Sequence, residues 1–362
     1  MHATLISAGY IALNAINQLG RDTTVRQLLK PIADALATPG VNELAINRPG
    51  EYWVKTFEGW QAVSCPDLTM PYLKSLANAI AVYNGVGMKA INSVILADGE
   101  RGQINMPPAT IDDTCSFNLR THSSVAKTLE ELDTDGAFSR ARDVSFNQPS
   151  QAEAEALTNA RDFTRLDPFE VELLALKREG KWREFLELCV RHHRNMIISG
   201  ATGSGKTTFA RSLIEKVSPD ERIITIEDVH ELKLPNHPNR VHMLYGDGAG
   251  RVSPKECLRA AMRMTPDRIF PAELRGDEAW EYISSLNTGH PGSITTTHAN
   301  SAIETYGRVF TLIKSSDVGR GLDSKLIKDE VYKTVHVVLY FERRQLVEVF
   351  YDPIFTKSKM AE

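Results

Sequence analysis

The chain has 362 residues, of which 42% are apolar and 24% are charged. This is the composition of a globular protein, and the length predicts two domains because one core rarely extends over so many residues. The 42 basic and 46 acidic side chains give a net charge of −4, so we do not expect stable binding to nucleic acid. No stretch approaches the roughly 18 consecutive apolar residues of a membrane-spanning helix.

Residues 3–19 are fairly apolar, but no Lys or Arg precedes them and Asn14, Asn17 and Gln18 interrupt them, so they do not fit an export signal. We expect a helix that packs on its own domain, with a surface helix that touches a membrane or a partner as the alternative. The four cysteines are widely spaced and include no C-x-x-C pair, which indicates neither a zinc site nor a disulfide framework. Without an export signal, a cytoplasmic protein is predicted.

Residues 1–139 predict an α+β domain built on an antiparallel sheet with helices on one side. Short strand-like runs joined by turns are typical of such a sheet. The expected strands are residues 41–47, 51–56, 60–63, 101–106 and 115–121. Thr69 is placed to cap a helix that has Pro71 in its first turn and ends near Tyr83.

Residues 140–164 are polar and prone to turns, and they predict an interdomain linker. Residues 165–362 predict a second domain of the α/β class, in which a helix begins after Asp167-Pro168 and apolar strands then alternate with helices. The expected order is strand 196–199, helix 206–216, strand 223–226, helix 254–264 and strand 293–296. This alternation indicates a mostly parallel sheet with helices on both faces.

One run of this domain matches the phosphate-binding pattern G-x-x-x-x-G-K-[ST] at every defined position. It consists of Gly200, Ala201, Thr202, Gly203, Ser204, Gly205, Lys206 and Thr207. Glycines let backbone amides surround a β-phosphate, Lys206 brings a positive charge to the β- and γ-phosphates, and the Thr207 hydroxyl is suited to ligating Mg²⁺. An apolar strand precedes the run and a helix follows it, so we predict a nucleotide site that extends to Thr208.

Acidic side chains follow two apolar strands of the same domain. Glu227, Asp228 and Glu231 cluster after strand 222–226, at the end where open parallel sheets bind ligands. A carboxylate there can hold Mg²⁺ or polarise the attacking water, and helix capping is the alternative. Glu273 follows residues 269–272 as the acid of a Walker B strand does, although Pro271 argues against a central strand.

Two histidines, His290 and His298, lie on either side of the run of threonines at residues 295–297. Their spacing does not suit a pair of metal ligands. They either sense the γ-phosphate or serve as structural loop residues, and the residues alone leave both interpretations open.

Taken in order, these motifs resemble the secretion ATPase superfamily, and most of all the hexameric traffic ATPases of type IV secretion and plasmid conjugation. The resemblance covers most of the chain, and its motifs lie at residues 41–52, 99–108, 222–232, 263–276, 288–299 and 351–353. It implies a RecA-like C-terminal domain and a ring motor that hydrolyses ATP with Mg²⁺. It also implies partners among the inner-membrane components of a secretion apparatus, and peripheral association with that membrane.

The resemblance assigns roles to matching residues of the second domain. It implies that Glu231 polarises the attacking water, that Glu227 and Asp228 support the metal, and that Glu273 is an atypical Walker B glutamate. His290 and His298 match a histidine box near the nucleotide.

Two arginines of the first domain also match the family. Arg101 and Arg120 correspond to arginines that reach the γ-phosphate across the domain cleft, where a guanidinium stabilises transition-state charge. The chain departs from the family pattern nearby, because Gly102 replaces a larger apolar residue and no proline follows Arg120 in residues 121–124.

Other functions remain open at this stage. A type II secretion or type IV pilus motor belongs to the same superfamily, but its extension enzymes often carry a four-cysteine metal module that this chain lacks. A nucleotide switch of the GTPase type would use Asp247-Gly248-Ala249-Gly250 as its D-x-x-G motif, yet no N-K-x-D follows to recognise guanine. A DNA-pumping hexamer would need a locally basic pore in an acidic chain.

Overall fold

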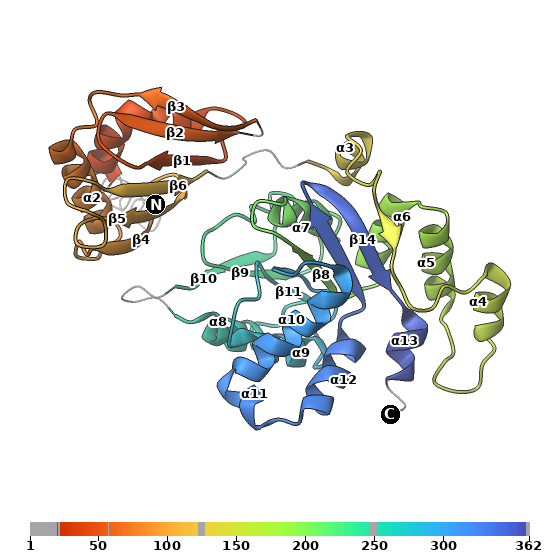
Figure 1. Ribbon diagram of the computed structural model, residues 1–362. Coiled ribbons are helices and arrows are strands. Elements are labelled where there is room, and N and C mark those ends of the chain that lie inside the picture. The colour runs from red at the N-terminus through yellow and green to blue at the C-terminus, as the bar shows by residue number, and fades with distance from the viewer. Residues whose placement is uncertain (1–19, 21, 57, 122–126, 247–251, 360–362) are drawn as a thin grey trace, which may run out of the picture. The chain divides into compact units, whose positions relative to one another are not determined.

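The computed structural model describes residues 20, 22–56, 58–121, 127–246 and 252–359. The chain divides into two compact units, one of residues 1–124 and 248–250, the other of residues 125–247 and 251–362 (Figure 1). The apolar segment 3–19 and the Asp247–Gly250 motif lie outside the described residues. None of the described helices has the length and apolar character that crossing a bilayer requires.

The first unit is an antiparallel sheet of order β3-β2-β1-β6-β5-β4, packed against helices. Its strands are β1 Glu43–Ile46, β2 Glu51–Thr56, β3 Gly59–Ser64, β4 Ile91–Ile95, β5 Arg101–Asn105 and β6 Ser116–Arg120. Residues 22–37 are helical, and α2 spans Met70–Tyr83. One apolar core joins buried side chains of α2, such as Leu76 and Ile80, to strand residues such as Phe117. The predicted antiparallel sheet is therefore confirmed, and Thr69 caps α2 by accepting a hydrogen bond from Tyr72 N.

β4 was not predicted, because polar residues at its centre break the apolar pattern of a strand. The same strand explains Gly102, the residue that departs from the family pattern. A Cβ on Gly102 would lie 2.7 Å from Val94 Cγ2 and 3.2 Å from Leu119 Cδ2. The two neighbouring strands thus fill the space that a larger side chain would occupy.

The second unit contains two groups of strands, of orders β10-β9-β11 and β12-β8-β13-β14-β7. The strands are β7 Arg142–Asp143, β8 Met196–Gly200, β9 Ile223–Glu227, β10 Arg240–Leu244, β11 Arg268–Pro271, β12 Ile294–Thr297, β13 Val337–Glu342 and β14 Gln345–Tyr351. Strands β8 to β13 pair in parallel, and among the described strand pairs of this unit only the β13–β14 hairpin is antiparallel. Leu274 N donates to Thr296 O at 2.8 Å, which joins the end of β11 to β12 and brings the two groups side by side.

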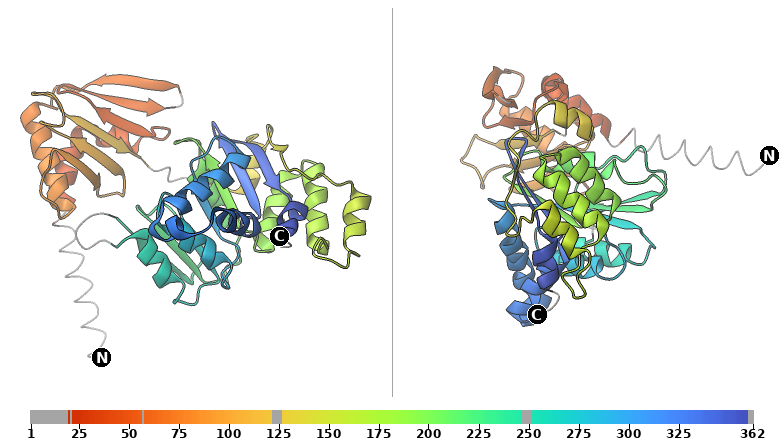
Figure 2. Two further views of the ribbon diagram at one scale, coloured as in Figure 1. Left: turned by 60° about the horizontal axis from the view of Figure 1, so that its bottom comes forward. Right: turned by 90° about the vertical axis from the view of Figure 1, so that its right-hand side faces the viewer.

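Helices cover both faces of these strands (Figure 2). They are α3 Leu129–Thr134, α4 Gln151–Leu157, α5 Pro168–Arg178, α6 Trp182–Arg191, α7 Lys206–Ile214, α8 Pro254–Ala261, α9 Glu278–Leu286, α10 Ala302–Ser315, α11 Asp317–Gly321, α12 Ser324–Thr334 and α13 Pro353–Ser358. Alternate residues of β8 point to opposite faces: Ile198 packs in the core with α5, α6 and α7, whereas Ile197 packs in the core with α8, α9, α10 and α12. The predicted α/β class with helices on both faces is confirmed.

Residues 140–164 are part of the second unit, so the change of unit near residue 124 comes before the position expected from the sequence. β7 pairs with β14, and Lys177 Nζ contacts Asp143 Oδ2 at 2.9 Å. The polar residues that suggested a linker include a capping pair, because Ser150 N donates to Glu153 Oε2 at 2.8 Å at the start of α4. Polar composition here marks a helix end rather than an open connection.

β11 is a strand despite Pro271, which is its last residue. Ala272 N donates to Ile226 O at 2.9 Å, so the next amide along the chain bonds to β9. Successive amides of a strand point to opposite sides, and the missing N–H of Pro271 therefore faces away from β9.

Candidate nucleotide-binding site

The phosphate-binding run forms a tight loop between β8 and α7. Three of its glycines have positive φ angles, of 147° at Gly200, 75° at Gly203 and 96° at Gly205. Gly200 is the most confined, since a Cβ there would lie 2.2 Å from Phe341 O on the neighbouring strand β13. Gly205 lies at the N-cap of α7, which directs the positive end of the helix at the loop. The backbone therefore has the shape that surrounds a phosphate.

Lys206 is buried inside this loop. Its Nζ donates to Gly200 O at 2.8 Å and to Ala201 O at 2.9 Å, and it lies 3.4 Å from His298 Nδ1. His298 follows β12, and its Nδ1 also lies 3.1 Å from Gly200 O. The other ring nitrogen of His298 is 3.0 Å from Glu273 Oε1. Loops after β8, β11 and β12 thus converge at the carboxyl ends of parallel strands, and the structure brings Lys206, His298 and Glu273 together.

Arg275 links two of the predicted acids and was not singled out from the sequence. Its guanidinium contacts Glu273 Oε2 and Asp228 Oδ2, both at 2.8 Å. Burial alone raises the pKa of Glu273, but hydrogen bonding and charge from Arg275, with charge from His298 and Lys206, lower it overall. Glu273 is therefore held as a carboxylate. The sequence signal that could have identified Arg275 is its position two residues beyond Glu273, in a domain with several clustered acids.

Glu227 accepts hydrogen bonds from the backbone of the segment that follows it. Its side chain is fully buried, and Oε1 accepts the amides of Glu231 and Leu232, each at 2.8 Å. Oε2 accepts the hydroxyl of Thr225 at 2.9 Å. The carboxylate of Glu227 thus holds the backbone that carries Glu231. Glu227 is the last residue of β9, and its side chain points into the protein. Its position at the strand end did not predict this direction.

His290 is not brought to the loop of its own chain. It precedes β12, whereas His298 follows that strand, and its Nδ1 lies 3.1 Å from Pro266 O, before β11. His290 and Pro266 therefore lie at the amino ends of the parallel strands β12 and β11, opposite the end at which Lys206 lies. The predicted contact of His290 with the nucleotide therefore has no support within one subunit.

A second arginine that was not predicted from the sequence, Arg344, contacts the phosphate-binding loop. Arg343 and Arg344 form the two-residue turn between β13 and β14, with φ angles of 49° and 66°. Arg344 N donates to Ser204 O at 3.0 Å, and burial lowers the pKa of its guanidinium. Such turns usually contain Asn or Gly, so the two arginines gave no turn signal. Thr207 and Thr208 lie in the first turn of α7 and are partly exposed.

Arg101 and Arg120 belong to the first unit, where they form a cross-strand pair. They lie directly opposite each other on β5 and β6, and Arg120 also lies opposite Glu43 on β1. Residues that pair directly share one face of a sheet, so both arginine side chains leave the same face.

Known proteins resemble this chain over nearly its full length. A sequence profile of the family described as Type II/IV secretion system protein matches residues 163–341. The type IV secretion system protein VirB11 of Bartonella quintana is 36% identical over 93% of this chain and 96% of its own. The chain belongs to the VirB11 family.

Solved structures agree with this assignment. The crystal structure of the VirB11 ATPase from the Brucella suis type IV secretion system, in complex with sulphate, is 34% identical with a TM-score of 0.52, over 96% of this chain and 99% of that one. The pilus retraction motor PilT with bound ADP has a TM-score of 0.55 at 17% identity, over 92% of this chain and 87% of that one, and shows a shared fold.

Membership of the VirB11 family makes the chain an ATPase motor of a type IV secretion system. The resemblance recognised in the motifs is confirmed. The pilus-motor and nucleotide-switch alternatives are not favoured over it.

Replacing Gly200 with Ala tests the close approach of this VirB11-family loop to the neighbouring strand β13. The new methyl group would meet the carbonyl of Phe341, so we expect a loss of about 1–3 kcal/mol from overpacking in addition to the strain of a positive φ. Thermal unfolding measures the effect. Gly289→Ala is the matched control, because Gly289 has a φ of 105° and nothing within 4 Å of its Cβ position. Equal losses in the two variants would show that the clash does not matter.

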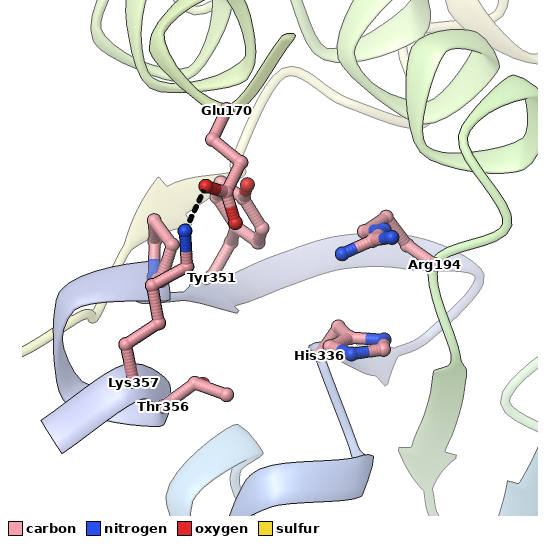
Figure 3. Close-up of a pocket in the computed structure, with 7 residues that line it drawn as sticks. Glu170, Arg194, His336, Tyr351, Thr356 and Lys357 are labelled. Carbon is pink, nitrogen blue, oxygen red and sulfur yellow. Dashed lines mark hydrogen bonds and ion pairs between the residues drawn. The ribbon is translucent and has the colours of Figure 1, made fainter. Parts of the chain in front are cut away.

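A small cavity of about 60 Å³ lies away from this loop, in the second unit (Figure 3). Lys357 and Glu170 pair at one side of it, and Arg194 and His336 lie at the other. His336 Nδ1 accepts the amide of Asn195 at 2.9 Å. Burial, with a smaller contribution from the charge of Arg194, lowers the pKa of His336 to about 3.

This buried histidine of the VirB11-family chain predicts a pH dependence. Unfolding restores a pKa of about 6.5, so the unfolded chain binds more protons between pH 6.5 and the folded value, and stability falls as pH drops through that window. We expect this group to cost about 2 kcal/mol between pH 7 and pH 5. Urea unfolding at both pH values should show a smaller acid loss in His336→Gln than in the wild type. An equal loss would contradict the assignment.

Proposed function

We propose that residues 200–208 bind the phosphates of Mg-ATP and that the chain is one subunit of a six-membered ring, as the family resemblance implies, that powers substrate transfer or pilus assembly. The observation that best supports this is the convergence of Lys206, His298 and Glu273 beside the loop. Lys206 lies 3.4 Å from His298, and His298 lies 3.0 Å from Glu273. Three separate segments of chain meet where the helix α7 begins.

The loop also has unmet capacity for an anion. Ser204 Oγ is buried and has no hydrogen-bond partner within the described chain, and the glycines leave the amides uncovered by side chains. Sulphate in the Brucella suis relative is an oxyanion like phosphate. An oxyanion bound to the amides and to Ser204 would satisfy these groups.

The residues present also fit a magnesium ion. The Thr207 hydroxyl, in the first turn of α7, and the Asp228 carboxylate would hold it, the latter directly or through water. When bound, Mg²⁺ neutralises charge on the β- and γ-phosphates. Arg275 orients Asp228 by its 2.8 Å contact.

Other residues of the chain then have distinct parts in hydrolysis. Lys206 exchanges its loop carbonyls for phosphate oxygens, and His298 lies where it contacts both Lys206 and Glu273 and so responds to the γ-phosphate. Glu231 polarises the attacking water. Its backbone N–H donates to Glu227 Oε1 at 2.8 Å, and this bond holds the residue in place. Transition-state charge is stabilised by fixed cations, the largest contribution that a phosphoryl-transfer site supplies.

Arg101 and Arg120 supply further positive charge from the first unit. The two arginines lie directly opposite each other on β5 and β6. An anionic γ-phosphate would attract both guanidinium groups, and it would make the approach of the first unit to the nucleotide depend on whether ATP or ADP is bound.

The ring, the role of residues 1–139 in its assembly, the inner-membrane partners and peripheral membrane association are parts of the same proposal. Electron microscopy of the purified full chain with a non-hydrolysable ATP analogue and Mg²⁺ tests it. We expect closed rings in which Arg101 and Arg120 lie at the γ-phosphate. Monomers at every nucleotide concentration, or arginines remote from the phosphates, would overturn it.

A further inference from the structure

Three potential metal ligands meet beside β9, away from the phosphate loop. Glu227 ends β9, His230 lies in the loop that follows, and His242 lies on the adjacent strand β10. His242 is directly opposite Thr225, which shares the face of β9 that carries Glu227. The cluster therefore joins β10 to the segment between Glu227 and Glu231.

Their geometry suits a tetrahedral ion. Glu227 Oε2 lies 3.2 Å from His230 Nδ1 and 3.8 Å from His242 Nδ1, and the ligand atoms all lie within 4.8 Å of one another. A zinc ion with bonds of about 2.0–2.2 Å to nitrogen and oxygen would separate its ligand atoms by roughly 3.3–3.5 Å. Small side-chain rotations would therefore complete three corners of a tetrahedron.

The charge and support of Glu227 favour a cation here. Its carboxylate is fully buried, and no Lys or Arg pairs with it anywhere in the described chain. Two backbone amides fix Oε1, which leaves Oε2 facing the imidazoles. Supporting hydrogen bonds of this kind orient metal ligands.

Both histidines can meet an ion from solvent. The side chain of His230 is 38% exposed and that of His242 is 22% exposed, so water can reach the fourth position. Thr225 Oγ1, 2.8 Å from His242 Nδ1, would keep its bond to Glu227.

We propose that Glu227, His230 and His242 bind a divalent transition-metal ion, for which zinc is the best match. Two nitrogen ligands distinguish this site from a magnesium site, which takes oxygen ligands. The ion would clip β10 to the segment that carries Glu231. Only this last consequence rests on the proposed role of Glu231 in hydrolysis.

Titration of the chelator-treated full chain with Co²⁺ tests the site, because tetrahedral Co²⁺ absorbs strongly in the visible range. We expect such a spectrum, displaced by Zn²⁺, at one equivalent per chain. His230→Ala and His242→Gln should each weaken binding by ~100-fold or more, since losing a residue that merely supports a ligand already costs roughly 10–100-fold. His192→Ala is the control, because His192 is a partly exposed histidine at the end of α6.

Circular dichroism establishes that each variant is folded. His230 is the more exposed of the two histidines, so its replacement should disturb the fold less than that of His242. Unchanged affinity in both folded variants would place the ion elsewhere and overturn the proposal. Absence of a tetrahedral spectrum would overturn it too, leaving a hydrogen-bonded cluster. The titration contains no nucleotide, so its failure is distinct from a failure of the proposed ATP site.

Discussion

Replacing Lys206 with Ala is expected to lower the rate of ATP hydrolysis by ~10²–10³-fold or more. The change removes the cation that we propose faces the phosphates. It also removes two hydrogen bonds, of 2.8 Å and 2.9 Å, from Lys206 to carbonyl oxygens of the loop. Both effects weaken the same site. Phosphate release from the purified full chain measures the loss.

Lys216→Ala provides the matched control for this prediction. Lys216 lies beyond the end of α7 and pairs with Glu130 and Glu187. Surface pairs of this kind contribute ~0–1 kcal/mol, so hydrolysis should survive. Full activity in Lys206→Ala would place the catalytic site elsewhere in the chain.

Replacing Glu231 with Gln is expected to reduce hydrolysis by ~10²–10⁴-fold while nucleotide binding remains. The amide has the size of the carboxylate but cannot take a proton from water. The backbone amide of Glu231 still donates to Glu227 at 2.8 Å, so the loop keeps its position. Single-turnover hydrolysis, measured beside equilibrium binding of an ATP analogue, separates chemistry from affinity.

Glu256→Gln makes the same change of charge at the N3 position of α8, where either residue can complete a capping box. It should hydrolyse ATP at the wild-type rate. If Glu231→Gln matched it, another group would have to activate the water.

Much of the fold could be predicted because its signals are local. Apolar runs such as 196–199 and 223–226 became β8 and β9, and Thr69 became a cap. Elements that depend on distant partners were harder to predict. β4 has a polar centre and becomes a strand by pairing with β5. Within residues 140–164, β7 pairs with β14, which follows far later in the chain.

The candidate site divides in the same way. Its phosphate loop is contiguous and was predicted residue by residue. Arg275 and Arg344 were missed because their contacts, with Asp228 and Ser204, join residues far apart in sequence. His290 and His298 lie close in sequence, yet β12 between them carries them to opposite ends of the sheet. A sequence motif gives such residues in order but not the end of the strand that each occupies.

The proposed function depends on a loop of backbone amides near Lys206 that holds the phosphates of ATP. Calorimetric titration of the wild-type full chain with a non-hydrolysable ATP analogue and Mg²⁺ tests it most directly. We expect saturable binding at one site per chain, weakened when Mg²⁺ is removed and lost in Lys206→Ala. Wild-type protein that binds no nucleotide, even at concentrations at which it assembles, would contradict the account.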